Sequence, residues 1–109
     1  MTTDSAMHPA VRRALDAANA GDTDAFLDAF AAQGAVDDWG RLFRGREAIR
    51  GWSDGEFIGV RVSLDVNGVR ADGDTVIVSS TVGGDGFNGP SDFAFTVGDD
   101  GILLMRITG

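Results

Sequence analysis

Cysteine is absent from the 109-residue sequence, which excludes disulfides, thiolate nucleophiles and cysteine-ligated zinc. The single histidine, His8, excludes a metal site made of several imidazoles. No apolar run approaches the ~18 residues that a membrane-spanning helix needs. The polar segment Met1–Met7 also lacks the apolar core of a signal peptide. We therefore expect a cytoplasmic protein that uses no metal, nucleotide or flavin cofactor and does not bind membranes.

Lysine is absent too, so nine arginines supply all the positive charge against 17 acidic residues. The net charge of -8 repels phosphate backbones and anionic lipid headgroups, so nucleic acid and membrane surfaces are not expected partners. A chain of this length buries somewhat under about 70% of its unfolded surface, enough for one core with a small pocket. We expect a single domain over residues 1–109, with residues 1–8 flexible.

Apolar residues follow a helical period in the first third of the chain and alternate in the last half. This pattern is typical of an α+β fold with its helices first. The spacing predicts one helix over residues 9–20, ended by Gly21, and a second from Asp22 or Thr23 to Gly34. The apolar stripe of the second helix consists of Phe26, Leu27, Phe30 and Ala31.

The middle of the chain predicts only short elements: an edge strand over residues 35–38, another strand over 41–44 and one or two helical turns over 47–54. Longer strands are predicted from Val60 onward, where alternation places Val60, Val62, Leu64 and Val66 on one face. Three more strands follow over residues 76–82, 91–97 and 102–108, each joined by a tight turn. Such a meander predicts one antiparallel sheet that curls over the helices.

Two further patterns have a functional and a structural interpretation. The segment Gly84–Gly89 matches the glycine spacing of dinucleotide sites, but Pro90 and a strand follow where that site needs a helix, which favours a simple hairpin. Four arginines between residues 41 and 50 either clamp an anionic ligand or pair with surface acids. His8 precedes a helix start, where we expect a cap or an exposed ring and no catalytic role.

The aromatic residues are too many for so small a core unless some of them line a cavity, because large rings pack well only against other rings or a ligand. We expect about half of them to fill the core and half to form a pocket wall. The rings concerned are Trp39, Phe43, Trp52, Phe57, Phe87, Phe93 and Phe95.

Asp38 is a candidate general base. Strand alternation sends it to the same side as the apolar Val36 and opposite to Asp37, and Trp39 follows it directly. If Val36 faces the core, Asp38 does so as well. Apolar surroundings beside an aromatic ring disfavour the charged form of a carboxylate, which suits a group that takes up and returns a proton.

Asp92 is a candidate acid on another strand, where it alternates with Ser91 and Phe93. If its side of the strand faces the helices, a protonated Asp92 can donate a hydrogen bond to a carbonyl oxygen that becomes negative during enolisation. In the alternative, Phe93 and Phe95 fill the core and Asp92 is hydrated. The sequence leaves both readings open.

The order and spacing of several strings resembles the nuclear transport factor 2-like superfamily, which includes ketosteroid isomerases and SnoaL-like polyketide cyclases. The resemblance spans nearly the whole chain and implies a cystatin-like cone, in which the N-terminal helices pack in a curved antiparallel sheet. The strings are Asn19–Asp22, Phe30–Ala31, Ala35–Asp38, Gly45 with Ala48–Arg50, and Leu104–Arg106.

The resemblance also implies roles for particular residues. Asp38 occupies the position of the isomerase general base, the second acid of a pair that closes the first strand. Asp92 occupies that of the oxyanion-side acid, fourteen positions, counted inclusively, from Met105. Ala14 stands where the isomerases have a tyrosine, and Trp39 stands where they have proline. The implied pocket is lined by Ala14, Trp39, Trp52 and Phe57.

Three hypotheses follow. The protein is a cofactor-free cyclase or isomerase that binds a small apolar carbonyl compound and transfers a proton through Asp38 and Asp92. Alternatively, it is a binding module with a degenerate pocket and no turnover. Thirdly, it serves mainly as an assembly unit, a homodimer paired through the outer face of the sheet, where Ile77 adds apolar surface.

Overall fold

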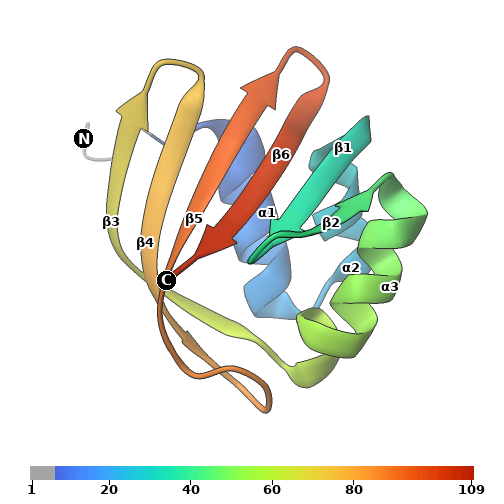
Figure 1. Cartoon of the computed structure of the whole chain (residues 1–109), viewed down its shortest axis with the longest axis vertical. Helices are drawn as coiled ribbons and strands as arrows, with labels where there is room; N and C mark the ends of the chain where they lie inside the picture. The colour runs from blue at the N-terminus through green and yellow to red at the C-terminus, as the bar shows by residue number, and fades with distance from the viewer. Residues whose placement is uncertain (1–6) are drawn as a thin grey trace.

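The structure, a computed structural model, describes residues 7–109 as a curved six-stranded sheet with helices on one face (Figure 1). The α+β prediction is confirmed. Along the sheet the strand order is β2-β1-β6-β5-β4-β3. The helices are α1 (Pro9–Ala20), α2 (Thr23–Asp28), α3 (Arg46–Glu56) and the short 3-10 helix η2 (Ile58–Val60). The strands are β1 (Phe30–Asp38), β2 (Arg41–Arg44), β3 (Ser63–Asp72), β4 (Thr75–Gly83), β5 (Gly89–Gly98) and β6 (Gly101–Thr108).

The predicted flexibility of residues 1–8 falls mostly outside the described residues. Of the two that are described, Met7 is buried and His8 caps α1, since its Nδ1 accepts a hydrogen bond from the amide of Ala10 at 3.0 Å. Gly21 ends α1 in the left-handed conformation at φ 71°, which glycine adopts without strain. The first helix therefore has the predicted limits, and His8 has the predicted capping role.

The second helix is shorter than predicted. It ends at Asp28, and the chain enters β1 at Phe30, so Phe30 and Ala31 belong to a strand and not to a helical stripe. Both residues are buried, and buried apolar runs of this length suit either element. The prediction of Gly34 as a helix end was wrong, because Gly34 lies within β1.

Strand β1 is an interior strand and not the short edge strand predicted. It pairs antiparallel with β2 on one side and parallel with β6 on the other. The sheet is therefore mixed rather than wholly antiparallel. The meander of β3 to β6 is confirmed, although Val60 lies in η2 and Val66 is 37% exposed, so neither extends the predicted inward row of β3.

Helix α3 is longer than the one or two turns predicted, and its Ile49 and Trp52 are buried together as expected. The chain then turns back at η2. Gly59 makes this possible, because a Cβ atom there would overlap the backbone carbonyl of Asp54. This turn packs η2 against α3. Among residues 7–109, no helix is long and apolar enough to cross a membrane.

Candidate functional site

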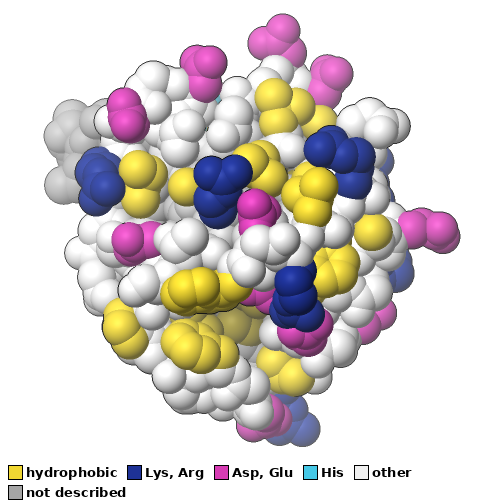
Figure 2. Space-filling view, viewed as in Figure 1, with side chains coloured by type: hydrophobic (Ala, Val, Ile, Leu, Met, Phe, Trp, Pro, Cys, Tyr) yellow, Lys and Arg dark blue, Asp and Glu magenta, His cyan; other side chains and the backbone are white. Residues whose placement is uncertain are grey.

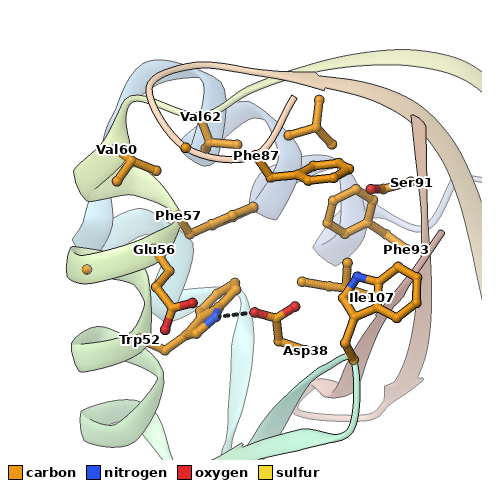
Figure 3. Close-up of a pocket in the computed structure, with 14 residues that line it drawn as sticks. Asp38, Trp52, Glu56, Phe57, Val60, Val62, Phe87, Ser91, Phe93 and Ile107 are labelled. Atoms are coloured by element: carbon orange, nitrogen blue, oxygen red, sulfur yellow. Dashed lines mark hydrogen bonds between the residues drawn. The ribbon is translucent and has the colours of Figure 1, made fainter. Parts of the chain in front are cut away.

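A cavity of about 300 Å³ lies between α3, η2, the β4–β5 loop and the inner face of the sheet (Figure 3). Its walls are mainly apolar, with a few polar groups from separate elements, as small-molecule sites have. The lining residues are Asp38, Trp39, Trp52, Gly55, Glu56, Phe57, Val60, Val62, Val82, Gly86, Phe87, Ser91, Phe93 and Ile107.

Aromatic rings shape this cavity. Trp52 and Phe57 stack on the α3 side with ring centroids 4.8 Å apart, and Phe93 contributes a ring from the sheet. Trp39 and Phe87 are 64% and 59% exposed, and Figure 2 shows hydrophobic side chains gathered beside a hollow on this face. The other two rings lie outside the cavity wall: Phe95 is fully buried in the core, and Phe43 is partly buried and packs against the core. The prediction of an equal division between core and pocket wall was wrong, because five of the seven rings line the cavity and Trp52, Phe57 and Phe93 belong to the buried core as well.

Asp38 enters the cavity from the end of β1, on the same side as the fully buried Val36. Its side chain is only 16% exposed. Trp52 and Arg41 both donate to the same oxygen, Oδ2: the Nε1 of Trp52 lies at 3.0 Å and a guanidinium nitrogen of Arg41 at 2.6 Å. No hydrogen bond from residues 7–109 reaches Oδ1, which faces the open space in Figure 3. One oxygen is thus anchored and the other is available to a ligand.

The surroundings of Asp38 are more polar than predicted, because Arg41 connects it to a second carboxylate. Arg41 binds Glu56 through two hydrogen bonds of 2.6 and 3.0 Å, and Glu56 also lines the cavity. These bonds to Glu56, followed by the bond to Asp38, raise the pKa of Arg41. The same guanidinium lowers the pKa of Glu56 below its ordinary value of 4.5, so Glu56 stays ionised at neutral pH.

Asp92 lies on the outer face of the sheet and away from the cavity. Its neighbours Ser91 and Phe93 are buried on the inner face, and the cross-strand partners of Asp92 are Ser79 and Thr108. The alternative reading of the sequence, with Phe93 and Phe95 in the core, describes this strand. Asp38 and Asp92 are therefore not brought together, and Asp92 cannot donate a hydrogen bond into this pocket.

Of the four residues predicted to line the pocket, three line the cavity and one does not. Trp39, Trp52 and Phe57 line the cavity. Ala14 is buried in α1 as part of the core and lies outside the cavity wall, which corrects its placement. Its methyl group leaves no donor at the place where the resemblance implies a tyrosine.

Sequence reasoning missed Glu56 and Ser91. Glu56 follows Trp52 by one helical turn, so spacing alone places both on one face of α3. Ser91 shares the inward parity of Phe93 and Phe95, is 4% exposed and has no hydrogen-bond partner among residues 7–109. The parity of the strand would have found Ser91 once the phenylalanines were assigned to the core.

The arginine cluster pairs with the protein itself and does not converge on one ligand site. Arg50 binds Asp24 at 3.0 Å, while Arg44 and Arg46 donate to backbone carbonyls. The segment Gly84–Gly89 forms the β4–β5 connection, residues 84–88, and the first residue of β5, which confirms the hairpin interpretation. Within the described part of the chain, no three His, Cys, Asp or Glu side chains gather closely enough to hold a metal ion.

Comparisons with solved structures find the same fold. A candidate polyketide cyclase from Sinorhizobium meliloti is 25% identical, with 96% of this chain and 98% of that chain covered and a TM-score of 0.83. A hypothetical protein with a ketosteroid isomerase-like fold from Catenulispora acidiphila, solved in complex with trimethylamine, is 22% identical, with coverage of 93% and 85% and a TM-score of 0.78. A cystatin-fold protein from Novosphingobium aromaticivorans is 13% identical, with coverage of 92% and 95% and a TM-score of 0.80.

Among curated protein sequences, none matches this chain. The sequence profile of the SnoaL-like domain matches residues 11–109, which is nearly the whole chain. The cone of helices in a curved sheet and the cystatin-like and ketosteroid isomerase-like neighbours agree with that match. The chain therefore belongs to the SnoaL-like domain family.

Proposed function

We propose that the protein binds a small, apolar carbonyl compound in this cavity and transfers a proton within it, with Asp38 as the general base. The observation that carries the proposal is that the two oxygens of Asp38 have different surroundings. Oδ2 accepts hydrogen bonds from Trp52 and Arg41, while Oδ1 faces the cavity. A positioned carboxylate with one free oxygen is what proton abstraction from carbon requires. Asp92 has no part in this proposal.

The chemistry needs no cofactor. Oδ1 of Asp38 takes a proton from a carbon made acidic by the carbonyl group, and the electron pair of that C–H bond moves into the enolate. The enolate then accepts the proton at another carbon, which is an isomerisation, or attacks a second carbonyl carbon of the same molecule, which is a cyclisation. In either case Asp38 returns its proton and ends unchanged.

Conversion of cyclohex-3-enone to cyclohex-2-enone tests the proposal, since it needs only removal and return of one proton. We expect the wild-type protein to accelerate the conversion, followed by ultraviolet absorbance, and Asp38→Asn to lose about 10²–10⁴ of that acceleration. Binding of cyclohex-2-enone should survive the substitution, because Asn keeps the shape of the side chain. A rate unaffected by Asp38→Asn contradicts the proposal.

A second candidate function is binding of a small ammonium cation without turnover. Rings of Trp52, Phe57 and Phe93 line the same cavity as the Asp38 carboxylate, and both ring faces and a negative charge attract cations. The Catenulispora relative was solved with trimethylamine. For this function, trimethylammonium should bind more tightly than the neutral ketone, and Asp38→Asn should abolish that binding rather than turnover.

The outer face of the sheet supports a further part of the proposal, pairing of two copies. Ile77, Ala94 and Leu104 lie there only partly covered, and Leu103 is 44% exposed. Partly exposed apolar side chains on a sheet face suit a self-complementary interface. We expect light scattering to give the mass of a dimer, and a strictly monomeric mass would rule this pairing out.

A further inference from the structure

We propose that Ser91 is the hydrogen-bond donor that recognises the carbonyl oxygen of the ligand, with Ser80 as its partner on the neighbouring strand. This inference rests on the proposed function. It assigns the oxygen-binding end of the cavity to β4 and β5, whereas the proton-accepting end belongs to Asp38 on β1. Ser91 is then a specificity-determining residue for a site in which Ala14 and Asp92 supply no donor.

Ser91 has the burial and direction that such a donor needs. Its side chain lines the cavity and is 4% exposed. Figure 3 shows it beside Phe87 and Phe93, on the sheet side of the cavity. None of residues 7–109 forms a hydrogen bond with its hydroxyl. Once a ligand displaces water from the cavity, a hydroxyl left without a partner is costly, and a carbonyl oxygen that accepts its hydrogen bond removes that cost.

Ser80 supplies the second observation. It lies directly opposite Ser91 in the β4–β5 register, is 1% exposed, and its Oγ is buried without a hydrogen-bond partner in the described part of the chain. Directly opposite residues have Cβ atoms about 4.5–5.5 Å apart, so a rotation about χ1 brings two serine hydroxyls within hydrogen-bond distance. Ser80 can then donate to Ser91 while Ser91 donates to the ligand. The two adjacent hydroxyls, which have no partner among residues 7–109, are thus satisfied together.

The register also limits the ligand. Asp38 pairs with Ile107, Ile107 pairs with Phe93, and Ser91 lies two residues along β5 from Phe93. Two strand spacings and two residues of rise place the Cα atoms of Asp38 and Ser91 about 12 Å apart. The side chains reach into this gap from both ends, which leaves room for one ring. The ligand class is therefore a neutral cyclic or aromatic ketone whose oxygen reaches Ser91 while its ring extends toward Asp38.

The charge of the wall favours a neutral oxygen over a carboxylate at this end. Val82, Phe87 and Phe93 line the cavity near Ser91, and no arginine is among the lining residues. An anion there would lose its hydration without gaining a cation. A ketone needs only the one donor that Ser91 provides.

Three probes separate the two ends of the cavity. 4-Hydroxyacetophenone carries both a hydroxyl donor and a carbonyl acceptor, acetophenone carries only the carbonyl, and 4-ethylphenol only the hydroxyl. Ser91→Ala should weaken both ketones about 2- to 10-fold, as loss of one hydrogen bond does, and leave 4-ethylphenol unchanged. Asp38→Asn should weaken the two phenols and leave acetophenone unchanged. Affinities are measured by NMR titration of the full-length protein.

Further variants separate recognition from structure. Ser80→Ala should weaken the ketones less than Ser91→Ala does. Ser79→Ala, a matched change on the outer face of the same strand, should alter none of the affinities. With ¹³C at the carbonyl carbon of acetophenone, the bound resonance should lie downfield in the wild-type protein and return upfield in Ser91→Ala.

Two results overturn the assignment. If Ser91→Ala changes neither the affinity of the ketones nor the carbonyl resonance, the role of Ser91 is refuted. The proposed role of Asp38 is tested separately, by the effect of Asp38→Asn on the affinity of the two phenols. If the wild-type protein binds none of the three probes at millimolar concentration, both this inference and the proposed ligand class fail.

Discussion

The indole Nε1 of Trp52 and the Oδ2 of Asp38 lie 3.0 Å apart, which joins the middle of α3 to the end of β1. The indole itself is held by stacking on Phe57 at 4.8 Å between centroids. Because the hydrogen bond is donated to a carboxylate, it belongs to the stronger class of such bonds. It fixes the carboxylate so that Oδ1, which accepts no hydrogen bond from residues 7–109, faces the cavity.

Trp52→Phe tests how much this hydrogen bond contributes to the free energy of unfolding. The substitution keeps an aromatic ring and removes the donor, so we expect a loss of about 1.5–3 kcal/mol in the free energy of unfolding, measured by urea denaturation. Trp39→Phe is the control, since Trp39 is 64% exposed and has no side-chain hydrogen bond among the described residues. That change should cost less than about 0.5 kcal/mol. Equal losses in the two variants would mean that the Trp52 hydrogen bond contributes nothing.

The pairing of Glu56 with Arg41 predicts a pH dependence. The pKa of Glu56 is lowered in the folded protein from its ordinary value of 4.5, so its stabilising contribution is complete above that value and is lost as the pH falls through the lowered pKa. Glu56→Gln should therefore be less stable than wild type at neutral pH. The difference between the two should shrink in acid, below about pH 4.5. A difference in unfolding free energy that stays constant with pH argues against the ion pair.

Asp92→Asn distinguishes the role that the family resemblance implies for Asp92 from the position of Asp92 on the outer face of the sheet. Asp92 faces away from the cavity, so the variant should convert cyclohex-3-enone as fast as wild type and bind the three probes equally well. The contrast with Asp38→Asn, which removes a carboxylate of the same size, makes the pair a matched comparison. A loss of conversion in Asp92→Asn similar to that in Asp38→Asn would place a functional group on the outer face of the sheet, contrary to the structure.

Gly59 controls the turn that closes one end of the cavity. Gly59→Ala places a Cβ atom against the Asp54 carbonyl, and we expect a cost of about 1–3 kcal/mol in unfolding free energy. Gly51→Ala is the control within α3, because a Cβ there meets no atom within 4 Å. Alanine favours helix over glycine, so Gly51→Ala should stabilise the protein by about 0.5–1 kcal/mol. The same sign for both variants would contradict the packing at η2.

The sequence predicts the parts of this fold where the spacing of apolar residues is compatible with only one type of secondary structure. Alternation in half-buried strands placed Val78 and Ile107 on ladder strands, and alternation with Val36 turned Asp38 inward. Phe30 was assigned to a helix because a short, fully buried apolar run has no period that distinguishes the two elements. The parallel pairing of β1 with β6 was missed for a related reason, since contacts distant in sequence leave no local pattern.

The sequence predicted some residues of the candidate site but not how they are connected. Asp38 and the rings of Trp52 and Phe57 were identified in advance, because apolar neighbours mark an inward acid and an excess of rings marks a cavity. Asp92 was assigned to the site on the family resemblance, whereas alternation left both faces of its strand open and the face with Phe93 and Phe95 is the inner one. The arrangement of Arg41 between Asp38 and Glu56 depends on three separate elements, which only the folded chain brings together.

A crystal structure of the protein with 4-hydroxyacetophenone is the most direct measurement of the central claim, that the free oxygen of Asp38 meets the ligand inside the cavity. We predict the ligand hydroxyl about 2.7–3.0 Å from Oδ1 of Asp38, with Trp52 still bonded to Oδ2. A ligand bound elsewhere, or an Asp38 whose Oδ1 contacts only solvent while the probe occupies the cavity, would contradict the account.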